Sequence, residues 1–288
     1  MESAAPSLRE DRLQLPGGAA GAELVLHTWS PTRHPRGVVV AVHGIGGHGA
    51  PFRHLAEGLA PQGWAVWAPD LPGHGLSPGP RGWVPAWGAL GAAVAAALGR
   101  AGSELPGIPR VLLGHSLGGT VCLDLLLREP MLAAGLRGLV LSNPALDAEG
   151  IAPWRVLVAR WLAWLWPTLT LNTGIDMTLA SRDPSALERF RSDPLRHSRC
   201  SVRLGAGFLA TAATVAGRVP ELRLPLLLLQ SGDDRVTGPA AAERVFAAAG
   251  SPDKTWHLYP ESRHELFDDL DRPAVLADLG AWLEIHGA

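Results

Sequence analysis

The sequence predicts an α/β fold in which helices cover both faces of a mostly parallel sheet. Short apolar or β-branched runs alternate along the chain with longer stretches of helical periodicity. Two of these runs, residues 38–42 and 226–229, are apolar throughout, which is typical of strands buried on both faces of a parallel sheet. Alternation of such strands with helices is the pattern of βαβ units.

The expected elements follow one another in a regular order. Each expected strand is a short apolar or β-branched run, and each expected helix is a longer stretch with apolar residues at helical spacing. Residues 1 to about 10 are expected to be frayed. Strands are expected at residues 22–29, 37–43, 63–69, 110–115, 136–142, 224–230 and 255–259. Helices are expected near residues 51–60, 83–101, 117–129, 238–249 and 272–285.

One long segment interrupts this alternation. About 80 residues separate Ser142 from the strand near Leu224, far more than a strand–helix connection needs. We therefore expect an inserted subdomain, with a core formed by residues 1–143 and 223–288 and a helical cap formed by residues 144–222.

The inserted segment begins with an apolar helical face. Its members recur at the spacing of one helix side and are Trp154, Leu157, Val158, Trp161, Leu162, Leu165 and Trp166. Arg155, Arg160 and Pro167 interrupt a stretch already too short to span a membrane. We expect a cap helix that lines an apolar pocket. Plain packing on the core and contact with a lipid surface are the alternatives.

The composition excludes several classes of protein. Charged residues make up 18% of the chain and the net charge is −2, which argues against a disordered chain and against a nucleic-acid binder. Cys122 and Cys200 form no disulfide framework, and no spacing matches a zinc site. Residues 1–15 contain three acidic side chains and no apolar run, so we expect no signal peptide and a cytoplasmic location.

A candidate nucleophile lies between a strand and a helix. Residues 114–118 read Gly-His-Ser-Leu-Gly, directly after one expected strand and at the start of a helix. A serine in such a turn is held in a strained backbone conformation with its hydroxyl raised above the sheet. The flanking glycines are needed because strand and helix approach too closely for a side chain. Ser116 is therefore the candidate nucleophile.

A serine nucleophile needs a base, and the base needs an orienting acid. In sheets with this turn the acid and then the histidine follow the serine along the chain. The histidines beyond Ser116 are His197, His257, His264 and His286. His264 is the candidate base because its loop follows the carboxyl end of the last expected strand.

The candidate acid belongs to the loop after the preceding strand. That loop has the form Gly-x-Asp-x-Val, which favours Asp234 over its neighbour Asp233. Asp147, which follows the strand ending at Ser142, is a further alternative.

A developing oxyanion needs two N–H donors aimed at one point. The N–H of Leu117, directly after the candidate nucleophile, is the first candidate. The second is the N–H of Ile45, in the glycine-rich loop at residues 43–47. His43 is expected to hold this loop in place.

Taken together, these motifs resemble the monoacylglycerol lipase and lysophospholipase branch of the α/β-hydrolases over nearly the whole chain. The matching segments are residues 43–46, 70–77 with 79–82, 114–119, 192–195 and 227–236. The resemblance implies an eight-stranded sheet, a helical cap after the sixth strand and hydrolysis of single-chain lipid esters. It implies no metal and no organic cofactor.

The resemblance also suggests which side chains contact the substrate. His48 and His115 match residues of the family's site, whereas Phe190 and Phe267 stand where the monoglyceride lipases have a tyrosine and a histidine. A glutamate and an arginine of those lipases correspond to Gly47 and Pro51. The site therefore looks less polar at its alcohol end. The predicted substrate-binding residues are His48, His115, Trp161, Phe190 and Phe267.

The predicted function is that of a serine carboxylic-ester hydrolase that forms an acyl-enzyme on Ser116. A broader carboxylesterase or lysophospholipase is the alternative within esterases. A peptidase or amidase on the same scaffold, and a catalytically silent binding module, are further alternatives. The expected partner is a small lipid ester and not a nucleic acid. Transient contact of the cap with a membrane surface is the alternative that would make the protein peripheral, and the oligomeric state stays open.

Overall fold

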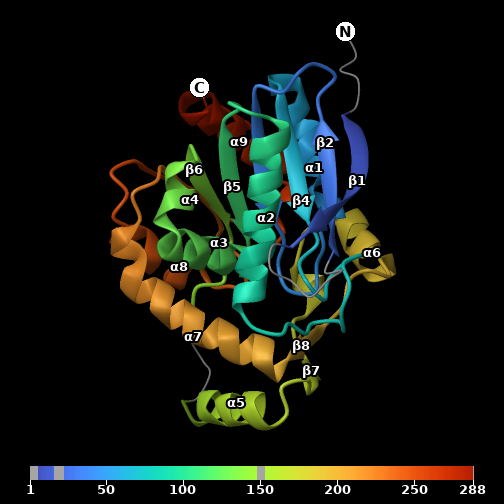
Figure 1. The fold of residues 1–288 in the computed structure, drawn as a ribbon, viewed down its shortest axis with the longest axis vertical. Coiled ribbons are helices and arrows are strands. Elements are labelled where there is room, and N and C mark those ends of the chain that lie inside the picture. Colours follow the sequence, from blue (N-terminus) through green and yellow to red (C-terminus); the bar gives the residue numbers. More distant parts are fainter. Residues whose placement is uncertain (1–5, 16–22, 148–152, 288) are drawn as a thin grey trace.

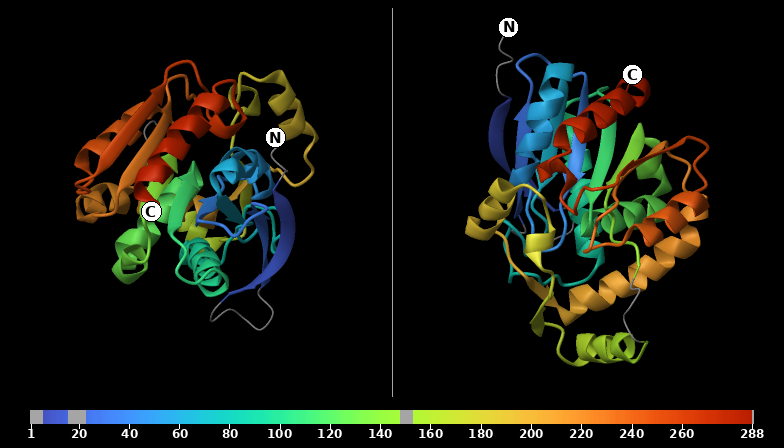
Figure 2. Two further views of the ribbon diagram at one scale, coloured as in Figure 1. Left: turned by 90° about the horizontal axis from the view of Figure 1, so that it is seen from above. Right: turned by 180° about the vertical axis from the view of Figure 1, so that it is seen from behind.

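The computed structural model has one main sheet with helices on both faces (Figures 1 and 2). The structure describes residues 6–15, 23–147 and 153–287, and within the helix that begins at Pro153 it leaves out the side chains of residues 153–156, 159 and 160. Residue 22 of the first expected strand and the side chain of Trp154 therefore lie outside the described part of the chain.

The main sheet has eight strands. They are β1 (Ser7–Gln14), β2 (Glu23–Ser30), β3 (Gly37–Val42), β4 (Trp64–Pro69), β5 (Arg110–His115), β6 (Gly138–Ser142), β9 (Leu226–Ser231) and β10 (Lys254–Tyr259). Their spatial order is β1-β2-β4-β3-β5-β6-β9-β10. Strand β2 runs antiparallel to both of its neighbours, and every other pair is parallel. The mostly parallel eight-stranded sheet is thus confirmed.

The expectation that residues 1 to about 10 are frayed is wrong for residues 7–10, which belong to strand β1, while residues 1–5 lie outside the described part of the chain. Strand β1 pairs with β2 over its full length, from Ser7 opposite Ser30 to Gln14 opposite Glu23. Its side chains are mostly exposed and only Leu13 is buried. Backbone pairing at the sheet edge therefore orders this strand, and such pairing leaves no apolar run in the sequence.

Two helical layers sandwich the sheet (Figure 2). One layer contains α1 (Arg53–Leu59) and α9 (Arg272–His286), and the other contains α2 (Gly88–Glu104), α3 (Leu117–Arg128) and α8 (Pro239–Ala248). Side chains alternate between the layers along β3, because Val38, Val40 and Val42 join one apolar core while Val39 and Ala41 join the other. Helix α4 (Pro130–Ala134) and the 3₁₀ turns η1 (Ala50–Phe52), η2 (Ala60–Gln62) and η5 (Leu266–Asp268) complete these layers.

Between β6 and β9 the chain leaves the sheet and forms the inserted segment, residues 144–222. Its described elements are α5 (Pro153–Leu165), β7 (Thr170–Asn172), η3 (Met177–Leu179), α6 (Pro184–Ser192), β8 (Arg199–Ser201), α7 (Val202–Arg218) and η4 (Val219–Glu221). Helix α7 runs across one end of the main sheet, with α5 farther from the sheet (Figure 1). The side chain of Ser201 caps α7 by accepting the N–H of Leu204, and Asp183 caps α6 by accepting the N–H of Ser185.

The inserted segment is attached to the core by hydrogen bonds and ion pairs. The N–H of His197 donates to the carbonyl of Gly46, at 3.0 Å. Arg182 ion-pairs with Asp269 and Asp271, whose carboxylates follow the loop after β10. The segment between η3 and β8 is therefore tied to loops that carry candidate site residues.

Candidate active site

Ser116 occupies the turn between β5 and α3 in a strained conformation. Its φ of 53° and ψ of −123° lie in a region of backbone conformation that residues other than glycine rarely adopt. A Cβ on Gly114 would lie 2.7 Å from the carbonyl oxygen of Gly118, and a Cβ on Gly118 would lie 2.3 Å from that of Val42. The two glycines thus allow the close strand–helix approach that holds Ser116 in this conformation.

His264 and Asp234 form a buried hydrogen-bonded pair. Nδ1 of His264 lies 2.8 Å from Oδ2 of Asp234, so Nδ1–H donates and Nε2 is left as the basic nitrogen. The carboxylate also accepts the backbone N–H groups of Val236 and Thr237, at 2.8 and 2.9 Å, and the Thr237 hydroxyl, at 2.8 Å. Burial alone would raise the pKa of Asp234, but the imidazole and these hydrogen bonds lower it, so the carboxylate is ionised.

The candidate base and nucleophile face the same space. Ser116 and His264 both line a small cavity and are each 6% exposed. Within the described residues the Ser116 hydroxyl makes no hydrogen bond. Such catalytic contacts often form only when substrate is bound.

The alternative acids point elsewhere. Asp233 pairs with Arg235, with Oδ1 and Nε 2.9 Å apart. Asp147 pairs with Arg244 through a 2.8 Å contact. Of the three aspartates considered, Asp234 is the one whose carboxylate meets His264.

The glycine-rich loop after β3 is held by His43. Nδ1 of His43 donates to the carbonyl of Gly44, at 2.7 Å, and Nε2 accepts the N–H of Leu71, at 3.0 Å. Burial lowers the pKa of His43 to about 4, so the ring is neutral, as this pair of hydrogen bonds requires. A Cβ on Gly44 would lie 2.9 Å from the Ser116 Cβ, so the loop touches the candidate nucleophile.

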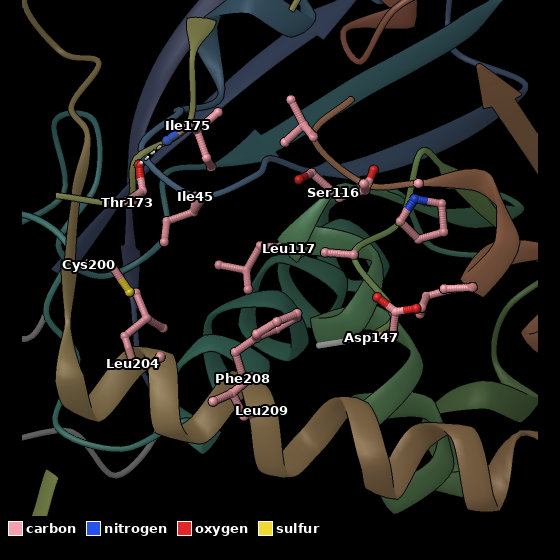
Figure 3. A pocket seen from close by; sticks show the side chains of 18 of the residues that line it. Ile45, Ser116, Leu117, Asp147, Thr173, Ile175, Cys200, Leu204, Phe208 and Leu209 are labelled. Carbon is pink, nitrogen blue, oxygen red and sulfur yellow. Dashed lines mark hydrogen bonds between the residues drawn. The ribbon is translucent and has the colours of Figure 1, made fainter. Parts of the chain in front are cut away.

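A large cavity of about 610 Å³ opens beside Ser116 (Figure 3). Its wall is mostly apolar, and helix α7 contributes Leu204, Phe208 and Leu209 across from Ser116. Ile45 and Leu117, whose N–H groups are the candidate oxyanion donors, line the same cavity.

A smaller cavity of about 50 Å³ also has Ser116 in its wall. The walls of the two cavities have four residues in common, which are Ile45, Ser116, Ile175 and Val236. Gly47, Pro51 and Phe267, which the sequence analysis assigns to the alcohol end of the site, line the small cavity. The side chains of Arg196, Glu265 and Asp268 also line it. The wall therefore also contains charged side chains that the sequence analysis did not place there.

The predicted substrate-binding residues fall into two groups. His48, His115 and Phe267 line the small cavity. Phe190 and Trp161 line neither cavity: Phe190 packs under the guanidinium of Arg196, 4.0 Å from ring centre to carbon, and Trp161 is 65% exposed on α5. The expectation that the Trp-rich face lines the pocket is therefore wrong for its described side chains. Helix α7 separates α5 from the cavity and supplies the apolar wall itself.

The sequence analysis missed several residues that support the site. Asn143, which follows β6, donates to the Ser231 hydroxyl and to the carbonyl of His264, at 2.8 and 2.6 Å. It adopts a φ of 42° and is completely buried. Its signal in the sequence is its place directly after a buried strand that ends at the site. Arg196 and Glu265 lie 69 residues apart and give no local motif.

One group of described side chains has the residue types of a metal site. Ligand atoms of His27, His48 and Asp70 lie within 4.8 Å of one another, and all three residues are buried. The Asp70 carboxylate already accepts the N–H groups of Gly49 and Leu76, both at 2.7 Å, and contacts the His27 ring at 3.1 Å. These bonds give the group a structural task, which is to hold the loops after β3 and β4 together.

A serine can attack a carbonyl only when a base accepts its proton and donors hold the oxyanion. The loops after β3, β5, β9 and β10 bring a serine, an imidazole–carboxylate pair and a glycine-rich loop to one edge of the sheet. This sheet with this arrangement at its carboxyl edge defines the α/β-hydrolase class of serine hydrolases. The chain belongs to the family described as serine aminopeptidase, S33, whose model matches residues 33–271.

Known proteins of this class are similar over nearly the whole chain. The monoacylglycerol lipase of Mycolicibacterium smegmatis is 30% identical, over 93% of this chain and 95% of its own length. The monoglyceride lipase of Mus musculus is 31% identical, over 92% and 88%. The crystal structure of the Paleococcus ferrophilus monoacylglycerol lipase superposes with a TM-score of 0.82 and 32% identity, over 92% of this chain and 99% of that one.

Proposed function

We propose that the protein hydrolyses esters of single acyl chains, such as monoacylglycerols, through an acyl-enzyme on Ser116. The observation that carries this proposal is that Ser116 lines both a large apolar cavity and the small cavity whose wall contains His264, the partner of Asp234. A cavity of about 610 Å³ falls in the range of small-molecule sites and suits an acyl chain. The similarity to lipases of monoacylglycerols supports the same substrate class.

The reaction proceeds in two acyl-transfer steps. Nε2 of His264 takes the proton of the Ser116 hydroxyl as its oxygen attacks the ester carbonyl, and then gives that proton to the leaving alcohol. A water attacks the acyl-enzyme in the same way, with His264 again as base, and releases the fatty acid and Ser116. Asp234 holds the imidazole in the required tautomer and stabilises its cation.

The N–H groups of Ile45 and Leu117 are proposed to stabilise the tetrahedral oxyanion. Both residues adjoin Ser116 in the cavity wall, and Leu117 begins α3, where backbone N–H groups have no intrahelical partner. A donor of this kind contributes about 10²–10³ in rate.

The inserted segment, residues 144–222, is proposed to act as a cap over the candidate site. In the sequence it separates the two parts of the core. Helix α7 supplies one wall of the large cavity, which supports this role. Residues 1–143 and 223–288 then form the core.

Helix α5 is proposed to contact a membrane surface transiently. The exposed apolar side chains at this end of the molecule are Leu157, Val158, Trp161, Trp164, Leu165, Trp166 and Leu171. Tryptophan and leucine on one exposed helix face are typical of helices that lie in a lipid interface. Among the described helices, none has the length and apolar character to cross a bilayer. The proposed location is the cytoplasm, with peripheral contact where the substrate is dissolved in lipid.

A hydrolysis panel on the purified protein tests this function, with Ser116→Ala as the blank. The panel contains p-nitrophenyl esters from acetate to palmitate, 1-monooleoylglycerol, lysophosphatidylcholine and an aminoacyl anilide. We expect the highest kcat/KM on medium or long monoesters and no turnover by Ser116→Ala. Preference for short esters would favour a general carboxylesterase, and preference for the anilide a peptidase. Absence of all turnover and of fluorophosphonate labelling would leave a binding module.

A further inference from the structure

The small cavity beside Ser116 contains a partly buried charge pair that the proposed mechanism does not use. Nη1 of Arg196 donates to Oε1 of Glu265, at 3.2 Å, and Oε2 of Glu265 lies 3.3 Å from Nε2 of His115. The side chains of Arg196 and Glu265 are only 13% and 18% exposed, and both line the cavity. Glu265 directly follows His264 in the chain.

This pair is held in place and keeps unused hydrogen-bonding capacity. The ring of Phe190 stacks on the Arg196 guanidinium, and the backbone N–H of Glu265 donates to the carbonyl of Ala180, at 2.8 Å. Among the described residues, the guanidinium of Arg196 donates a single hydrogen bond, which goes to Glu265. A guanidinium has five N–H donors and a carboxylate has about four acceptor sites, so both groups can still bind a polar ligand.

We propose that Arg196 and Glu265 form the subsite for the leaving alcohol and select small neutral alcohols that carry free hydroxyl groups. Glu265 accepts a hydrogen bond from a hydroxyl group of the alcohol, and Arg196 donates one to a hydroxyl oxygen. This inference rests on the proposed ester hydrolysis and adds the specificity of its alcohol side.

Charge and size both favour a neutral polyol. The cavity wall carries charges of both signs. Glu265 and Asp268 would repel an anionic head group, and Arg196 would repel a cationic one, whereas a neutral polyol is repelled by neither. A volume of about 50 Å³ holds about three to five water-sized groups. The free part of a glycerol ester has this size, and a phosphocholine group exceeds it.

The test replaces the charge pair by an apolar pair, because a single substitution would leave the other charge buried and unpaired. The variant is Arg196→Met with Glu265→Leu. The control is Arg191→Met with Glu188→Leu, an ion pair on α6 whose two side chains are 67% and 65% exposed. The measured quantity is kcat/KM for 1-monolauroylglycerol divided by kcat/KM for ethyl laurate.

We expect this ratio to fall at least about tenfold in the cavity variant, the value of lost hydrogen bonds to the leaving group, and to stay constant in the control. An unchanged ratio would overturn the proposal. So would equal losses on both esters in a variant with the native melting temperature, because the pair would then position His264 without reading the alcohol.

A binding measurement separates this proposal from the proposed function. The probes are 1-O-dodecylglycerol and ethyl dodecyl ether. They carry the glycerol and ethyl portions of the two esters and contain no ester bond to hydrolyse. The wild type is expected to bind the glycerol ether more tightly, by a margin that the cavity variant loses. Loss of that margin in a protein without esterase activity would support the subsite while rejecting the reaction. Equal affinity of the wild type for both ethers would reject the subsite.

Discussion

Asp233 and Asp234 are adjacent in the sequence, yet the structure gives their carboxylates different partners. Asp234 meets His264 and three donors of its own loop, whereas Asp233 pairs with Arg235. The difference follows from geometry, since neighbouring side chains in a loop cannot both face one imidazole.

Replacing Asp234 by Asn is therefore expected to lower kcat at neutral pH by about 10⁴-fold, because the amide no longer fixes the tautomer with a basic Nε2. Asp233→Asn is the matched control and is expected to change kcat less than about threefold. Steady-state kinetics on one soluble ester measure both. Losses of similar size in the two variants would contradict the assignment of Asp234.

His264 sets the pH dependence of the proposed reaction. Burial lowers the pKa of His264, and the positive charge of Arg196 lowers it as well. The Asp234 carboxylate, its hydrogen bond to the ring and the charge of Glu265 raise the pKa by more than this, so the pKa of His264 lies above the usual 6.5. Only the neutral imidazole accepts the serine proton, so kcat/KM is expected to rise with pH through a midpoint above 6.5. His115, whose ring centre is 4.8 Å away, is neutral in this range because burial lowers its pKa to about 4.

The charge pair beside His264 shifts that midpoint in a predictable direction. Glu265→Gln removes a negative charge and is expected to move the midpoint to lower pH, whereas Arg196→Met removes a positive charge and is expected to move it to higher pH. The pH profile of kcat/KM for ethyl laurate records both shifts. Displacements in the same direction would show that Glu265 and Arg196 do not act on His264 through their charges.

At the scale of elements, the turn between β5 and α3 depends on atoms that are missing from glycine. A Cβ on Gly118 would collide with the carbonyl oxygen of Val42, whereas a Cβ on Gly99, exposed in the middle of α2, would meet no atom within 4 Å.

Gly118→Ala is thus expected to destabilise the protein by about 1–3 kcal/mol. Gly99→Ala is expected to stabilise it by about 0.5–1 kcal/mol, since alanine favours the helix and fits without a clash. Urea unfolding measures both free energies. If the two substitutions had the same sign, the close approach of α3 to β3 would not explain the glycine.

Helix α5 presents Trp161 and Trp164 to solvent, and this predicts lipid binding that is separable from catalysis. The double variant Trp161→Ser with Trp164→Ser is expected to bind phosphatidylcholine vesicles at least about tenfold more weakly. The control Met131→Ser with Ile285→Ser removes side chains that are 86% and 75% exposed elsewhere on the surface. A co-sedimentation assay that finds equal losses in both variants would reject α5 as the contact.

The sequence predicted elements well where one residue pattern determines them. Strand β3 is a continuous apolar run because both of its faces are covered, and the whole strand is buried. Strand β1 lacked such a pattern, because main-chain pairing with β2 orders it. The expected role of α5 as pocket lining was wrong for a related reason. The sequence pattern predicts an apolar helix face, but it does not predict whether protein or lipid contacts that face.

At the scale of the whole molecule, ion pairs connect the inserted segment to the loop of the candidate base. Arg182 contacts Asp269, which is completely buried, and Asp271, whose carboxylate also accepts the Ser262 hydroxyl. Arg263 donates to the carbonyl groups of Thr178 and Ser181. The part of the insertion near η3 is thereby fixed to the core.

Arg182→Met is expected to destabilise the protein by about 2–3 kcal/mol, because it leaves the buried carboxylate of Asp269 without its cation. Arg191→Met, in the exposed pair with Glu188, is expected to have little effect. Thermal unfolding of both variants tests the difference. Equal melting temperatures would show that the insertion is not held by this pair.

The candidate site was predictable from sequence only in part. Ser116, Asp234 and His264 each belong to a local motif at the end of a strand, so their roles could be inferred from the chain order. Arg196 and Glu265 meet only because the insertion folds back onto the loop after β10. No spacing in the sequence records such a contact, so the sequence analysis did not place these two charged side chains in the small cavity.

The most direct test of the central claim is to trap the acyl-enzyme. The protein is mixed with p-nitrophenyl laurate, quenched with acid within milliseconds, digested and analysed by mass spectrometry. The account predicts a lauroyl group on the peptide that contains Ser116, and its absence in Ser116→Ala. A lauroyl group on another residue, or full turnover by Ser116→Ala, would contradict the account.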